Sequence, residues 1–142
     1  LAGEMSGHFF FKERWFGFDD GIYSGARMLE ILAKSQQNSE DFFKALPNSV
    51  NTPEIKLSIS PEQKQNLLEN LPKAAGFAKA RCLTLDGLRV EFDQGWGLIR
   101  ASNTTPHLVL RFEAETAVAL EEIQQIFKEE ILKLDANLML PY

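Results

Sequence analysis

Residues 86–92, with the sequence DGLRVEF, constrain the fold of this chain more than any other segment. Leu88, Val90 and Phe92 alternate with charged residues, and this period of two is typical of a β-strand that buries one face. An Asp-Gly pair before such a strand predicts a two-residue hairpin turn at Asp86 and Gly87. The segment therefore predicts antiparallel strand pairing in this part of the chain.

Further strands are predicted around this hairpin. A second turn is expected at residues 93–95, and the segment EIKLSIS, residues 54–60, alternates like DGLRVEF. The apolar residues that mark the further strands are Ile55, Leu57 and Ile59, then Leu98 and Ile99, and finally Leu108, Leu110 and Phe112.

Two helices are expected to accompany these strands. The first begins at Ser60, the expected N-cap, with Pro61 at the first helical position and Gln63 completing a capping box. The second covers residues 116–135, where one face is apolar and the opposite face is charged. The residues expected to be buried are Leu67, Leu68 and Leu71 in the first helix, and Leu120, Ile123, Phe127, Ile131 and Leu134 in the second. This order predicts an α+β domain, an antiparallel sheet of four to five strands with two helices on one face.

The start of the chain differs in pattern. Residues 9–18, FFFKERWFGF, predict a buried strand or hairpin, and residues 19–35 predict a helix. The apolar residues at helical spacing are Ile22, Ala26, Leu29 and Ala33. The acidic pair Asp19 and Asp20 could belong to a metal site, but no further ligand is placed to complete it, and we expect one of them to cap the helix.

A linker is predicted after this helix. Residues 38–54, NSEDFFKALPNSVNTPE, have the composition of a short closing helix followed by a linker. We expect the boundary between residues 47 and 53. Residues 1–48 then form a partial α/β segment, and residues 49–142 form the α+β domain.

The chain begins without methionine and runs directly into aromatic sequence. Natural termini are usually polar and mobile, so this start predicts a fragment cut from a longer protein. The aromatic cluster would then lack a partner surface, and we expect it to be strained, mobile or self-associated. Its members are Phe9, Phe10, Phe11, Trp15, Phe16 and Phe18.

The formal net charge of −5 argues against a general affinity for nucleic acid or anionic membranes. Single-stranded RNA binding on an open sheet face is also disfavoured, because the predicted strands carry aliphatic residues rather than paired aromatics. The apolar runs are too short to span a bilayer and the start does not resemble a signal peptide, so the cytoplasm is the expected compartment. The single cysteine, Cys82, is expected to be a packed strand residue.

The segment RASNTTPH, residues 100–107, is more polar than a turn requires. Arginine binds a phosphate through two parallel donors, and hydroxyls and backbone amides can bind the remaining oxygens. This composition fits an anion receptor. It fits equally well a polar loop whose Ser102, Asn103 and Thr104 satisfy local backbone groups.

Four segments together resemble one family: GEMSGH (3–8), FFKERWFGFDDG (10–21), DGLRVEF (86–92) and WGLIRASNTTP (96–106). In this order they are similar to the C-terminal portion of the bacterial phosphomannomutase/phosphoglucomutase family, within the α-D-phosphohexomutases. The resemblance implies that residues 1–48 end the third of four domains. Residues 49–142 would be the fourth domain, with a TATA-box-binding-protein-like fold.

The resemblance also implies the roles of individual residues. Arg100, Ser102, Asn103 and Thr104 match the family's phosphate-binding loop, and Glu4, Ser6 and His8 match its sugar-binding loop. His8 could relay a proton or serve binding alone. No role is implied for His107, which is expected to be an exposed strand residue.

Members of this family interconvert hexose 1-phosphates and 6-phosphates through a phosphoserine and a bisphosphorylated sugar. The resemblance implies a Mg²⁺ cofactor, glucose 1,6-bisphosphate as intermediate or activator, and a mannose or glucose phosphate as substrate. No segment resembles the phosphoserine or magnesium loops, so no metal site is expected in this chain. We expect the chain to depend on the N-terminal domains of the same protein and to be inactive alone. The alternative is a stand-alone module that binds a phosphorylated ligand without catalysis.

Overall fold

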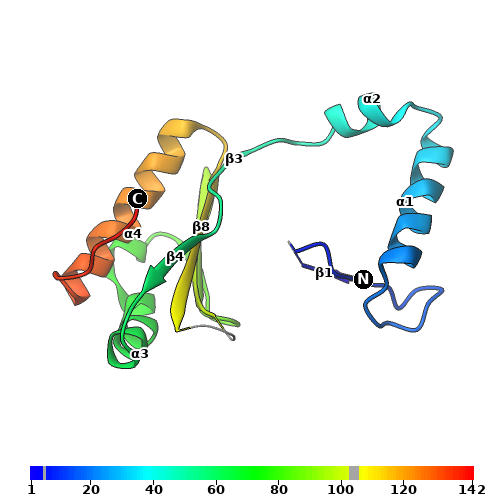
Figure 1. The fold of residues 1–142 in the computed structure, drawn as a ribbon. Helices are drawn as coiled ribbons and strands as arrows, with labels where there is room; N and C mark the ends of the chain where they lie inside the picture. Colours follow the sequence, from blue (N-terminus) through cyan, green and yellow to red (C-terminus); the bar gives the residue numbers. More distant parts are fainter. Residues whose placement is uncertain (5, 103–105) are drawn as a thin grey trace. The chain divides into compact units, whose positions relative to one another are not determined.

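The computed structural model describes residues 1–4, 6–102 and 106–142. The chain divides into two compact units, Leu1–Asn48 and Ser49–Tyr142 (Figure 1). The first unit contains the short strands β1 (Ala2–Gly3) and β2 (Phe9–Phe10) and the helices α1 (Gly21–Ser35) and α2 (Ser39–Lys44). No helix in the described part of the chain is long and apolar enough to cross a membrane.

Helix α1 begins as the sequence predicts. Asp20 is its N-cap, with extended backbone dihedrals, and its side chain accepts a hydrogen bond of 2.9 Å from the backbone N–H of Tyr23. A carboxylate at this position satisfies an N–H that has no partner inside the helix and interacts favourably with the helix dipole. Of the two aspartates, Asp20 is therefore the cap, and Asp19 is left for other contacts.

The predicted strand or hairpin over residues 9–18 is wrong beyond residue 10. Only Phe9–Phe10 form a strand, which pairs with Ala2–Gly3, and the following residues form turns. Gly17 reverses the chain with a φ of +90°. The expected burial is also wrong for the rings of Phe16 and Phe18, which are 72% and 53% exposed. With only the two-residue strand β1 beside β2, no sheet extends far enough to pair the rest of the segment.

The apolar stripe of α1 is exposed. Ile22 is 90% and Leu29 is 68% exposed, whereas Arg27 and Glu30 lie on the half-buried side. The Arg14 guanidinium donates two hydrogen bonds to Glu30, of 3.3 and 2.8 Å. Charged side chains therefore connect this helix to the preceding turns, while its apolar stripe faces solvent within this unit.

The second unit contains one sheet with the strand order β3-β8-β7-β6-β5, and β4 also pairs with β8. All the strand pairs are antiparallel. The strands are β3 (Val50–Asn51), β4 (Ile55–Ser58), β5 (Arg81–Leu83), β6 (Leu88–Phe92), β7 (Gly95–Ala101) and β8 (His107–Ala114). The described residues thus form a six-stranded sheet. Since β3 and β4 both pair with β8, they act as one interrupted edge strand, and counting this strand once gives the upper limit of the predicted four to five.

Thr52 and Pro53 separate β3 from β4. The backbone N–H of Thr52 donates to the Phe112 carbonyl at 2.9 Å, and the Thr52 hydroxyl accepts from the Phe112 N–H at 3.1 Å. Proline has no N–H to continue the ladder, so it is tolerated at this edge break. The Thr52 hydroxyl thus takes the place of a backbone carbonyl as the acceptor for the Phe112 N–H.

The two-residue hairpin predicted at Asp86 and Gly87 is wrong. Leu83 pairs with Arg89, so a longer loop, residues 84–87, joins β5 to β6. The tight turn is the one expected at residues 93–95, because Phe92 pairs directly with Gly95. The Asp86-Gly87 pair therefore lies in a longer loop and does not form a two-residue turn.

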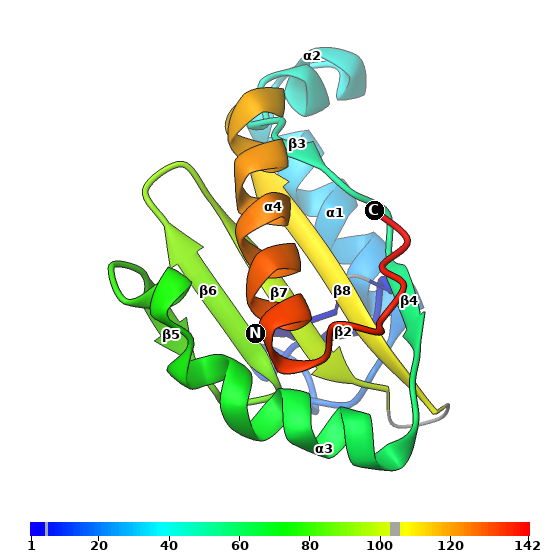
Figure 2. The same cartoon turned by 90° about the vertical axis from the view of Figure 1, so that its left-hand side faces the viewer.

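Helices α3 (Pro61–Asn70) and α4 (Ala117–Leu134) accompany the sheet, and Figure 2 shows α4 lying across it with α3 near one end. The 3₁₀ helices η1 (Leu71–Lys73) and η2 (Ala75–Phe77) follow α3. The predicted capping box is confirmed, since Ser60 and Gln63 each bond the other's backbone N–H. Fully buried core side chains include Leu67, Val90, Ile99, Leu110, Phe112 and Phe127.

Candidate functional site

Arg100 lies near the end of β7 and pairs with Val109 of β8. Its neighbour Ile99 is fully buried in the core, so strand alternation places Arg100 on the opposite, helix-free face of the sheet. The side chain is 37% exposed, and Nη1 lies 3.5 Å from Oδ2 of Asp86. The Ser102 N–H continues the backbone pairing with a bond of 3.0 Å to the His107 carbonyl. The structure thus places Arg100 and Ser102 at one end of the sheet.

Asn103 and Thr104, the other predicted phosphate ligands, lie outside the described residues. The same holds for Thr105, which follows them, and for Met5 in the predicted sugar-binding loop.

Gly87 explains why Asp86 lies beside Arg100. A Cβ at Gly87 would lie 2.3 Å from the Ile99 carbonyl oxygen and 2.7 Å from the Arg100 Cα, and its φ is +77°. Only glycine combines this dihedral with so close an approach to β7. The Asp-Gly pair therefore brings a carboxylate next to the predicted phosphate-binding arginine.

Arg111 of β8 was not among the predicted site residues. It pairs with Leu98, which places it diagonally from Arg100 on the same sheet face. Diagonal neighbours across two strands are about 7–8 Å apart, within reach of long side chains. Arg111 Nε is buried and has no hydrogen-bond partner in the described part of the chain. A buried donor without a partner is uncommon in proteins, which marks the half-buried guanidinium as a whole, rather than the shielded Nε itself, as a candidate for ligand contact.

His107 lies at the start of β8 and is half-buried rather than fully exposed. Its Nδ1 is 3.2 Å from the hydroxyl of Ser58 on β4, its direct neighbour in the sheet. This contact with Ser58 at the strand end accounts for the presence of His107 without a role in ligand binding.

Glu4, Ser6 and His8 lie in the turn between β1 and β2, and the structure brings the three together. The backbone N–H of Glu4 donates to the His8 carbonyl at 2.9 Å, and the Gly7 N–H donates to the Glu4 carbonyl at 3.0 Å. The Ser6 hydroxyl donates to the Glu4 carboxylate at 3.0 Å. Gly7 permits the turn with a φ of +87°. The result is an exposed carboxylate, hydroxyl and imidazole on one short turn.

His8 contacts Asp19, a residue expected only as a possible helix cap. Nδ1 of His8 lies 2.5 Å from Oδ2 of Asp19, and the two side chains are 55% and 41% exposed. The hydrogen bond from Asp19 is the main cause that raises the pKa of His8, and the charge of Asp19 adds to it. The contact with Asp19 therefore favours the protonated imidazolium.

Cys82 lies on β5 and packs against the core, as predicted. Burial raises the pKa of its thiol, which disfavours the reactive thiolate. Across residues 1–4, 6–102 and 106–142, no cluster of three or more His, Cys, Asp or Glu side chains could hold a metal ion.

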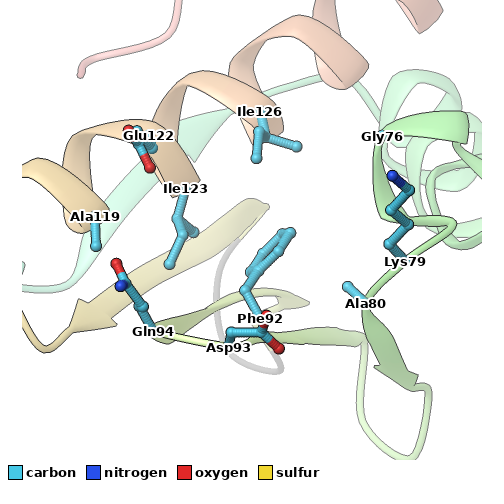
Figure 3. A pocket seen from close by; sticks show the side chains of 10 residues that line it. All are labelled: Gly76, Lys79, Ala80, Phe92, Asp93, Gln94, Ala119, Glu122, Ile123 and Ile126. Carbon is cyan, nitrogen blue, oxygen red and sulfur yellow. The ribbon is translucent and has the colours of Figure 1, made fainter.

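A cavity of 390 Å³ lies in the second unit between α4, η2 and the turn from β6 to β7 (Figure 3). Phe92, Ile123 and Ile126 form its apolar wall, and Lys79 and Glu122 supply charge. None of the described site residues predicted from the sequence lines it. The described residues predicted to contact phosphate or sugar therefore lie outside this cavity.

Two family models match the chain. The phosphoglucomutase/phosphomannomutase C-terminal domain matches residues 54–130, and the phosphoglucomutase/phosphomannomutase alpha/beta/alpha domain III matches residues 1–50. The two matches fall on the two structural units.

Curated relatives match over the whole chain or most of it. A phosphomannomutase/phosphoglucomutase of Pseudomonas syringae is 56% identical over 142 residues, covering 100% of this chain and 30% of the relative. A phosphoglucomutase of Neisseria gonorrhoeae is 58% identical over 134 residues, covering 92% and 29%. A crystal structure of a phosphoglucomutase/phosphomannomutase family protein from Burkholderia thailandensis has 49% identity and a TM-score of 0.89, covering 100% of this chain and 30% of that one. The chain spans about a third of the length of these relatives.

Proposed function

This chain belongs to the phosphoglucomutase/phosphomannomutase family, and we propose that it supplies the phosphate and sugar contacts of a phosphohexomutase. The whole enzyme would interconvert the 1-phosphate and 6-phosphate of mannose or glucose through a phosphoserine and a bisphosphorylated sugar. The second unit would bind the phosphate that is not reacting, and the first unit would bind the sugar.

The observation that carries this proposal is the placement of Arg100 on the open sheet face, diagonally from the unpartnered Nε of Arg111. Guanidinium groups bind phosphate through paired N–H donors, and a phosphate dianion matches two such groups better than one. Asp86, 3.5 Å from Arg100, gives the guanidinium a counter-ion until a phosphate binds. Ser102, Asn103 and Thr104 would add hydroxyl, amide and backbone donors.

The turn that carries Glu4, Ser6 and His8 supports the sugar half of the proposal. A carboxylate accepts hydrogen bonds from adjacent sugar hydroxyls, and a serine hydroxyl can donate or accept one. His8 would contact the sugar close to the reacting oxygen and relay a proton there. Because a mutase binds its sugar in two orientations, these groups must accept either end of the molecule.

The phosphoserine and Mg²⁺ are assigned to the parts of the relatives that lie outside the matched 30% of their length. Glucose 1,6-bisphosphate would be the intermediate of the whole enzyme, and the N-terminal domains of the same protein its main partner. We expect the 142-residue chain alone to show no mutase turnover with glucose 1,6-bisphosphate and magnesium supplied, and any rate above blank would contradict this.

The test of the phosphate site is Arg100→Lys in the full-length enzyme. Lysine keeps the charge but loses the paired donors, so kcat/KM for glucose 1-phosphate should fall about 10- to 150-fold, the equivalent of about 1.5–3 kcal/mol. Lys56→Gln is the matched control, because Lys56 is on the same sheet face two strands away and its removal should change kcat/KM by no more than about twofold. Equal effects of the two substitutions would refute the site.

A further inference from the structure

We propose that Asp19 is the positioning residue of His8: it holds the imidazole at Nδ1 and leaves Nε2 to face the sugar. This inference deepens the proposed function and rests on it, since it assumes that His8 contacts substrate. It assigns a role to a residue that the sequence patterns predicted only as a possible helix cap.

The geometry holds the Asp19 carboxylate on both oxygens. Oδ2 lies 2.5 Å from Nδ1 of His8, and Oδ1 accepts a hydrogen bond of 3.2 Å from the backbone N–H of Phe9. The backbone of Asp19 also forms a β-bridge with Phe10, and the Asp20 N–H donates to the Phe9 carbonyl at 3.4 Å. The carboxylate is therefore fixed to the strand that directly follows His8.

Helix capping does not account for this carboxylate. Asp20 is the N-cap and bonds the Tyr23 N–H, so the helix needs nothing from Asp19. The side chain of Asp19 instead points back across the turn to a residue 11 positions earlier. Among the described residues, the hydrogen bonds of this carboxylate are with His8 and Phe9.

An acceptor at Nδ1 decides which tautomer the neutral imidazole adopts. With Nδ1–H donated to Asp19, Nε2 carries the lone pair and can accept a proton from a sugar hydroxyl. When the ring is doubly protonated, Nε2–H can return that proton to a sugar oxygen. Fixing the ring orientation and tautomer in this way is the part that an aspartate plays beside a histidine general base.

The charges around His8 favour its protonated form, in which Nε2–H can act as a proton donor. Asp19 raises the pKa of His8 through its hydrogen bond and charge, partial desolvation opposes this, and Glu4 raises it further through its charge. Glu4 is itself hydrogen-bonded by Ser6 on the same turn.

The first test measures the His8 imidazole nitrogens by ¹⁵N NMR in this chain across pH. Asp19→Asn keeps the shape and can still accept from the Phe9 N–H, but its amide cannot hold Nδ1–H as a carboxylate does. We expect the wild-type Nδ1–H tautomer to give way to a mixture and the His8 pKa to fall. Asp20→Asn is the matched control, because it removes the neighbouring charge while asparagine remains a good N-cap. Unchanged His8 tautomer and pKa in Asp19→Asn would overturn the proposal.

The second test uses the full-length enzyme with the same two variants. Asp19→Asn should lower kcat about 10- to 100-fold with little change in KM, and the pH limb that reports His8 should move to lower pH. A uniform loss at every pH, or wild-type kcat with an altered tautomer, would overturn the positioning role. The Arg100→Lys variant tests the mutase function separately, so failure of the Asp19 proposal can be told apart from failure of that function.

Discussion

Gly97 lies in the middle of β7, and we predict that the core cannot accept even one methyl group there. A Cβ at Gly97 would lie 2.4 Å and 2.7 Å from Cε2 and Cζ of Phe127 and 3.0 Å from Cδ1 of Phe112. Both rings are fully buried and lie 5.2 Å apart in an edge contact, so neither can move without displacing the other. The glycine is therefore part of the packing between α4 and the sheet.

The expected magnitude follows from these distances. Contacts below 3.0 Å require the rings to move, and overpacking of this kind costs about 2–3 kcal/mol. Alanine also lowers the entropy of the unfolded chain relative to glycine, which offsets about 0.4–1 kcal/mol. The net loss of about 2 kcal/mol should lower the Tm of the second unit by about 8–16 °C.

The assay is urea and thermal unfolding of the chain, followed by core methyl NMR signals of the second unit. Gly25→Ala in α1 is the control, since a Cβ there meets nothing within 4 Å and alanine favours a helix. In Gly97→Ala combined with Phe127→Leu, the smaller side chain should relieve the contact, so the losses should be less than additive. A wild-type Tm for Gly97→Ala, or strictly additive losses, would refute the packing argument.

Three further predictions concern the cap, the counter-ion and acid stability. Ser60→Ala removes the N-cap bond of α3 and should cost about 1 kcal/mol in urea unfolding; an unchanged midpoint would contradict the capping assignment. Asp86→Asn removes the carboxylate beside Arg100 and should tighten phosphate binding about two- to fivefold in a calorimetric titration, whereas weaker binding would show that the carboxylate orders the site. Hydrogen bonds from Arg14 lower the pKa of Glu30 to about 2. Because this folded-state pKa is below the ordinary value of 4.5, the stabilisation is present above about pH 4.5 and is lost as the pH falls toward 2; carboxyl NMR shifts of Glu30 against pH would check this.

Much of the second unit could be predicted because its local patterns and tertiary environment agree. The capping box at Ser60 and the stripe of Ile123, Phe127 and Ile131 on α4 appear in the structure as the sequence predicts. In the first unit the local sequence patterns and the tertiary environment disagree. The stripe of Ile22 and Leu29 predicts a helix correctly, but both side chains are largely exposed among the described residues of this unit.

The parts of the site that were missed depend on contacts between distant segments. Asp19 precedes a helix and Asp86 precedes a glycine, so local rules assign them to a cap and a tight turn. Their contacts with His8 and Arg100 arise from the β-bridge at residue 19 and the close approach of Gly87 to β7. Strand register similarly places Arg111 diagonally from Arg100, and no spacing rule within one strand would have indicated it. The sequence shows that Asp19, Asp86 and Arg111 are charged residues near predicted strands and turns. It does not show which predicted site residue each of them contacts.

The most direct test of the account is an NMR titration of the isotope-labelled chain with glucose 1-phosphate, with chloride at matched ionic strength as control. The reporters are the backbone amides of residues 100–107 and the guanidinium Nε–H signals of Arg100 and Arg111. We expect saturable shifts in these signals and none in the guanidinium of Arg81, which lies on the edge strand β5 beside Glu91. Shifts no larger than those with chloride, or equal shifts at all three arginines, would contradict a phosphate site at this end of the sheet.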